Sequence, residues 1–89
     1  MNAIMTVVGS DQVGIIANVS QALSGCEINI VDISQTILSG NFVMMMMIDL
    51  SKANLPLDQL REKMNELGDA LSVDINIMNE RVFSAMHRI

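Results

Sequence analysis

The residues best suited to chemistry lie in one short glycine-bounded segment near the N-terminus, Gly9 to Ile15. Glycines let the backbone approach a ligand closely, and free N–H groups at the start of a helix attract a carboxylate. The alternative is structural: Gly9 and Gly14 make a tight turn, and Asp11 caps the helix that follows. The residues alone leave a ligand site and a plain loop both open.

Other reactive side chains do not combine into a catalytic or metal site. His87 is the only histidine and lies beside Arg88 near the chain end, which favours a solvated or dimer-contact role. Cys26 continues an apolar helical stripe and is interpreted as a small core residue. Thioethers bind Cu(I), but Met44 to Met47 would point alternately to opposite sides of a strand. We therefore expect no enzyme, no catalytic residue, no metal and no cofactor.

Composition narrows the class of protein. The 89 residues suffice for a single domain, residues 1–89. The net charge of -5 and the aromatic content of 2% disfavour nucleic-acid binding, which relies on basic and stacking side chains. The N-terminus lacks the basic start of a signal peptide, and no apolar run approaches the ~20 residues of a membrane span. We expect a cytoplasmic protein that binds neither nucleic acid nor membrane.

Two hydrophobic periods alternate along the chain. Continuous apolar runs predict strands at residues 3–8 and 42–50, and alternation of apolar residues predicts strands at residues 27–38 and 71–77. Helical spacing predicts one helix from Ile15 that ends at Gly25, and another from about Pro56 that ends at Gly68. Asn79 is suited to cap a final short helix.

The hairpin carries two finer signals. The apolar positions change phase near Ile30 and Val31, which indicates a bulge or bend in the second strand. Ser39-Gly40-Asn41 predicts a tight turn, because these residues tolerate positive φ. The complete order predicts an α+β, ferredoxin-like βαββαβ fold. Its four-stranded antiparallel sheet would carry two helices on one face, plus the short C-terminal helix.

The run Met44 to Met47 makes both faces of the third strand apolar. One face would pack under the helices, and the other needs a cover. Either the C-terminal segment, residues 80–89, folds across it or a second subunit covers it. A second subunit is the favoured interpretation, because apolar patches and adaptable methionines are typical of interfaces.

These segments together resemble the ACT domain family. The resemblance rests on the segment Gly9 to Ile15 and on Glu27-Ile28-Asn29-Ile30, and it extends over the whole chain. The segments from Asp32 to Thr36 and from Phe83 to Ile89 are similar to those of small, free-standing bacterial and archaeal ACT proteins. Related domains occur in glycine cleavage regulators and formyltetrahydrofolate deformylases.

The resemblance implies side-by-side pairing into a continuous sheet, with an amino acid bound at the seam. Asp11 would hold the ligand ammonium group, and Asn29 would reach the ligand across the seam. The positions that match the family's ligand-binding residues are Gly9, Asp11, Val13, Gly14, Ile15 and Asn29.

The expected function is that of a non-catalytic homodimer, or a higher assembly, that binds a small amino acid. Binding would modulate a partner enzyme or transcriptional regulator, because the chain has no output domain of its own. The alternative is a protein–protein interaction or dimerisation module without a small-molecule ligand.

Overall fold

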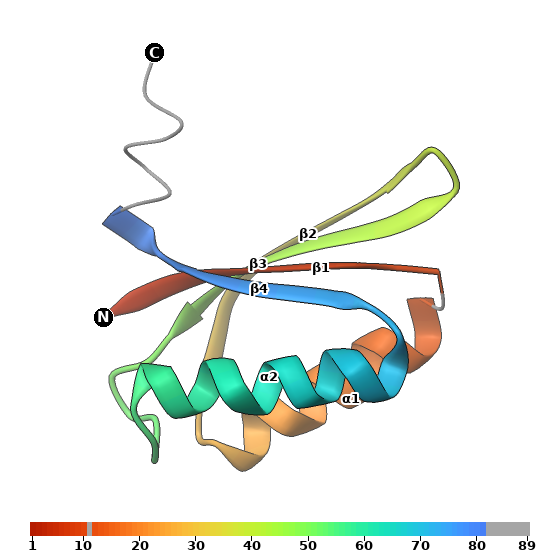
Figure 1. Cartoon of the computed structure of the whole chain (residues 1–89). Helices are drawn as coiled ribbons and strands as arrows, with labels where there is room; N and C mark the ends of the chain where they lie inside the picture. The colour runs from red at the N-terminus through yellow and green to blue at the C-terminus, as the bar shows by residue number, and fades with distance from the viewer. Residues whose placement is uncertain (11, 82–89) are drawn as a thin grey trace.

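The chain forms two layers, a four-stranded antiparallel sheet and a pair of helices on one of its faces (Figure 1). The computed structural model describes residues 1–10 and 12–81. The elements in chain order are β1 (Asn2–Gly9), α1 (Gln12–Gly25), β2 (Asn29–Leu38), β3 (Asn41–Asp49), α2 (Leu57–Leu71) and β4 (Asp74–Asn79). Across the sheet the order is β2-β3-β1-β4, so β2 and β4 are the edges. The predicted ferredoxin-like fold is confirmed.

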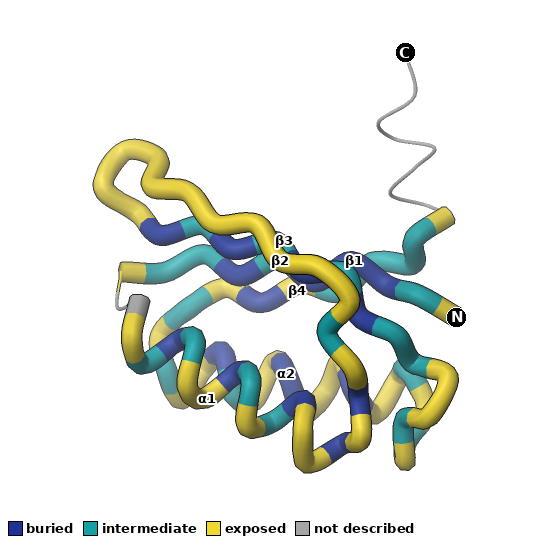
Figure 2. Tube along the Cα trace, turned by 180° about the vertical axis from the view of Figure 1, so that it is seen from behind, coloured by how far each residue is buried: buried dark blue, intermediate teal, exposed yellow. Residues whose placement is uncertain are grey.

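The core lies between the helices and one face of the sheet. Alternate residues of β1 and β3 line it, and the two helices contribute their apolar stripes. Figure 2 shows the buried positions along the strands and the helices. Its members, all at most 2% exposed, include Ala3, Met5, Val7, Ile15, Val19, Leu23, Cys26, Phe42, Met44, Met46, Ile48, Leu60 and Met64. Cys26 is therefore a small core residue, as predicted. Among the described residues, every buried side chain is apolar.

The hairpin follows the sequence prediction closely. The pairing of β2 with β3 shifts register between Ile30 and Asp32, so Val31 is the bulged residue. Ser39 and Gly40 have φ values of 53° and 80°, and the flanking Leu38 pairs with Asn41. Positive φ at both central residues defines the turn type that suits the twist of a two-residue hairpin.

The predicted helix ends are wrong, and in the same way for both helices. α1 begins at Gln12 and includes Gly25, and the left-handed residue after it is Glu27, with φ of 58°. α2 continues past Gly68 to Leu71 and ends at left-handed Ser72. Gly68 is needed for close packing instead, because a Cβ there would lie 2.8 Å from the Val73 carbonyl oxygen. The fourth strand consequently starts at Asp74, later than predicted.

The start of the predicted C-terminal helix lies at the edge of the described part of the chain. Asn79 Oδ1 accepts a hydrogen bond from the Arg81 backbone N–H at 2.8 Å, the contact expected of a capping residue. The rest of that prediction, including His87, lies outside the described residues.

Candidate functional site

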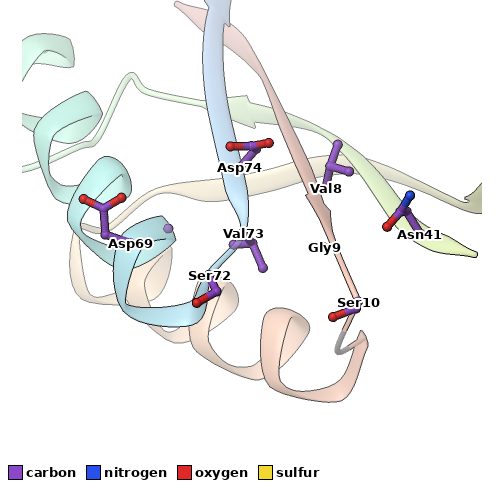
Figure 3. Close-up of a pocket in the computed structure, with 9 residues that line it drawn as sticks. Val8, Gly9, Ser10, Asn41, Asp69, Ser72, Val73 and Asp74 are labelled. Atoms are coloured by element: carbon purple, nitrogen blue, oxygen red, sulfur yellow. The ribbon is translucent and has the colours of Figure 1, made fainter.

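A depression in the described surface lies where β1 ends, β4 begins and α2 stops (Figure 3). We call it the Gly9 depression; its volume is about 660 Å³. Antiparallel pairing of Val8 with Asp74 brings these elements together. The lining residues are Val8, Gly9, Ser10, Asn41, Gly68, Asp69, Ser72, Val73 and Asp74.

The polar groups of this depression favour a ligand that donates hydrogen bonds. Asp69 and Asp74 contribute carboxylates, Ser10 and Ser72 contribute hydroxyls, and Asn41 contributes an amide. An ionised carboxylate accepts hydrogen bonds and cannot donate them. A ligand with an ammonium group, which only donates, would therefore suit this end of the molecule. In the described ranges no group of three or more His, Cys, Asp or Glu side chains is arranged to hold a metal ion.

Of the predicted ligand-binding residues that the structure describes, Gly9 alone lines the Gly9 depression. A Cβ at this position would lie 2.4 Å from Val73 Cγ1 and 2.8 Å from Ile15 Cδ1. Both contacts are shorter than real Cβ atoms make, so the absence of a side chain is required by packing. Gly9 is therefore a close-packing residue at the end of β1, not the tight-turn residue of the structural alternative.

Three further candidates, Val13, Gly14 and Ile15, belong to α1 instead of a loop. Val13 is 80% exposed, whereas Ile15 is 1% exposed and packs in the core. The carbonyl oxygen of Gly14 accepts a hydrogen bond from Asn18 Nδ2 at 2.7 Å. Asp11 lies outside the described residues. Ile15 is thus a core residue, while the side chain of Val13 is open to solvent.

Asn29 lies at the opposite end of the sheet. Asn29 pairs with Asp49 of β3, and Asp49 pairs with Asn2 at the start of β1. Gly9, at the end of β1, pairs with Phe42 near the start of β3. The two levels are separated by about 24 Å of extended strand. Asn29 lines a separate depression of about 430 Å³, together with Ser20, Leu23, Ser24, Glu27, Ile28 and Ile30. A single chain therefore does not bring the six predicted residues together.

Asp49, the neighbour of Asn29 in the sheet, is held in its charged form. The Ser51 backbone N–H donates to its Oδ1 at 2.9 Å. This bond, with a second from the Ser51 side chain, lowers the carboxyl pKa below its ordinary value of 3.8. Asp49 is therefore an anion at neutral pH, next to Asn29.

Reasoning from the sequence missed Asn41, Asp69, Ser72 and Asp74, and it included Ser10 only as part of the segment Gly9 to Ile15. The signal that would have found them is topological. In the predicted strand order the end of the first strand lies beside the start of the fourth, so the segments around Gly9 and Asp74 must meet.

These features define the structural class of the protein: a small α+β module with polar depressions at both ends of its sheet. None of the described helices has the length and apolar character that crossing a bilayer requires. A profile of the ACT domain family matches residues 2–78. The chain belongs to the ACT domain family, which places it among regulatory, ligand-binding modules.

Individual proteins agree with this assignment. A UPF0237 protein of Listeria innocua is 46% identical over 89 residues, which is 100% of both chains. The structure of an ACT domain protein from Streptococcus pneumoniae superposes with a TM-score of 0.82 at 41% identity, covering 93% of each chain. A formyltetrahydrofolate deformylase from Pseudomonas syringae matches with a TM-score of 0.78 at 28% identity, covering 86% of this chain and 26% of the deformylase. The resemblance to small free-standing ACT proteins and to deformylase domains is confirmed.

Proposed function

We propose that two copies of the chain join along β2 and bind a small amino acid between them, and that this binding regulates a partner protein. The observation that carries the proposal is the exposure of β2. This ten-residue edge strand leaves Val31, Ile33, Ile37 and Leu38 between 42% and 66% exposed. Long apolar edge strands are templates for pairing with another chain.

The side of β2 that is left bare strengthens the case. Ile33 pairs with Met46 and Ile37 with Phe42, so both lie on the helix-covered face of the sheet. Met46 and Phe42 are buried there, but Ile33 and Ile37 are 42% and 62% exposed. The chain's own helices leave this row uncovered, and Figure 2 shows the exposure continuing along β2. A second copy would extend both the sheet and its helix layer.

Antiparallel pairing of two β2 strands would unite the two halves of the predicted site. With full overlap of the ten residues, Asn29 of one copy lies opposite Leu38 of the other. Leu38 is one step from Ile37, which is level with Phe42 and Gly9. Asn29 of one copy then approaches the start of α1 in the other.

In this arrangement the start of α1 binds the ligand carboxylate, since backbone N–H groups and the helix dipole favour an anion. Asp11 binds the ammonium group, and Asn29 of the second copy adds a hydrogen bond. Because the ligand contacts both copies, it favours one pairing geometry over others and changes how the dimer meets its partner. The partner is an enzyme or a transcriptional regulator, and the module performs no reaction itself.

Isothermal titration with a panel of amino acids tests the proposal. We expect heat with at least one small amino acid, such as glycine or serine, and at least a tenfold weaker affinity in Asn29→Ala. The matched control is Asn65→Ala, an exposed Asn on α2, which should bind as the unchanged protein does. Equal affinity in the two variants would contradict the proposed site.

One observation favours the alternative of an interaction module without a ligand. The glycine at position 9 and the buried Ile15 are both explained by packing. A dimer that gives no heat with any amino acid of the panel would establish this alternative in place of the sensor.

A further inference from the structure

The face of the sheet opposite the helices carries an apolar stripe. Register places Ile4 between Met47 and Met78, and it places Val8 beside Val43. Together with Met45, these side chains form what we call the methionine stripe: Ile4, Val8, Val43, Met45, Met47 and Met78. Ile4 is only 4% exposed, and the other five are half-buried.

Polar residues border the stripe on both sides. Asp32, Ser34 and Thr36 follow it along β2, and Asp74 and Asn76 follow it along β4. Between its end levels, Ile4 and Val8, the stripe extends about 14 Å. The half-buried Thr6, which pairs with Met45 and Asn76, lies on the same face between Ile4 and Val8. The face therefore has the outline of a docking surface of about the length of a short helix, mainly apolar in the middle and with Asp32 and Asp74 at its edges.

The chain itself arrives at one end of this surface. Asn79, the last residue of β4, pairs with Ala3, one step from Ile4. Its side chain caps a helical turn that begins at Glu80, through the 2.8 Å contact to the Arg81 N–H. A depression of about 420 Å³ lies at this corner, lined by Met1, Asn2, Asn79, Glu80 and Arg81.

The sequence after Arg81 complements the surface in spacing, length and charge. Val82, Phe83, Met86 and Ile89 recur at the spacing of one helix face. A helix from Glu80 to Ile89 would be about 15 Å long, which matches the stripe. Arg88 would add positive charge at the end of the surface where Asp74 lies, since Asp74 pairs with Val8.

We propose that residues 82–89 dock on the methionine stripe of their own chain as an amphipathic helix. This assigns different occupants to the two apolar surfaces: the chain's own C-terminus covers the face, and the edge at β2 is left for a second copy. It also replaces the sequence-based interpretation that a second subunit covers the methionines. The proposal does not depend on ligand binding.

Methyl NMR tests this docking, because Phe42 and Phe83 are the only phenylalanines and the sequence has no Tyr or Trp. Phe42 lies in the core on the helix-covered face. With ¹³C-methyl methionine, we expect nuclear Overhauser contacts from the Phe83 ring to the methyls of Met45, Met47 or Met78. The methyls of Met44 and Met46, on the opposite face, should show contacts to Phe42 only.

A mixed sample identifies the chain that supplies the helix. One population carries labelled methionine and deuterated phenylalanine, and the other is unlabelled. Contacts within one chain then vanish, which is the expected result. Contacts that persist would show that a second copy is the occupant, and contacts absent from both samples would show that the segment does not dock; either outcome overturns the proposal.

Peroxide oxidation read by mass spectrometry gives a second measurement. In Phe83→Ala, Met45 and Met47 should oxidise several-fold faster, while Met44 and Met46, each 1% exposed, should not change. Ser84→Ala, off the apolar spacing, is the matched control and should oxidise as the unchanged protein does. Equal oxidation of Met45 and Met47 in the two variants would also overturn the docking.

Discussion

The two halves of the molecule, β1–α1–β2 and β3–α2–β4, follow one order but treat their edges differently. The first half ends in a ten-residue edge strand whose apolar side chains are exposed. The second half ends in a six-residue strand whose edge side chains include Asp74 and Asn76. Short, polar edges resist pairing with other chains, and long apolar edges invite it. The difference indicates that one half closes the domain and the other prepares it for association.

The same contrast appears in the glycines of the two helices. A Cβ on Gly25 in α1 would meet nothing within 4 Å, whereas a Cβ on Gly68 in α2 would collide with the backbone of Val73. In the second half, therefore, the backbone of α2 is in close contact with the segment that leads into β4. The first half has free space at the equivalent place.

The largest expected effect is the difference in stability between alanine substitutions at these two glycines. Gly68→Ala should lower the free energy of unfolding by about 2 kcal/mol, because overpacking against a backbone atom exceeds the helix preference of Ala. Gly25→Ala should raise it by less than about 1 kcal/mol, since Ala fits there and favours the helix. Urea denaturation followed by circular dichroism measures both. Equal shifts in the two variants would show that the halves are packed alike.

The next effect concerns the edges. Ile37→Lys on β2 should weaken self-association at least tenfold, about 1.4 kcal/mol, because it places a charge in the proposed seam. Asn76→Lys puts the same charge on β4 and should leave the association constant unchanged. Sedimentation velocity over a concentration series measures both constants. Stronger weakening by Asn76→Lys would move the interface to the other edge.

The smallest expected effect is the gain in stability from glycine at the left-handed residue that follows each helix, and it should be similar in both halves. Glu27 and Ser72 hold left-handed φ values of 58° and 57°, which cost an L-residue energy that glycine does not lose. Glu27→Gly and Ser72→Gly should each raise the free energy of unfolding by about 0.5–1 kcal/mol. Ser24→Gly, at an ordinary helical position, should lower it by about 0.5 kcal/mol. Thermal unfolding measures both changes: the melting temperature should rise for Glu27→Gly and Ser72→Gly and fall for Ser24→Gly.

Much of the fold could be predicted because its signals are local. Helical spacing picked out Ile15, Val19, Leu23 and Cys26 as one apolar stripe, and all four are buried. The phase change located the bulge at Val31, and the residues of the turn matched its positive φ values. Each of these features depends on neighbours within a few positions of the chain.

The candidate site was predicted only in part, because its residues meet through distant pairings. Gly9 lines a depression, and the Asp69 and Asp74 that share it come close through the pairing of β1 with β4. Asn29 was grouped with Gly9 by family resemblance alone, and within one chain they lie at opposite ends of the sheet.

By itself, then, the sequence determined the type and order of the elements, the apolar stripes of the helices and the hairpin turn. Periodicity and allowed backbone angles are properties of short segments, so they survive without knowledge of the rest of the chain. The tertiary structure alone decided that α2 continues through Gly68, that β2 has an uncovered row, and which polar side chains share a depression. Those outcomes depend on register and close contact between segments far apart in the chain, which no local pattern encodes.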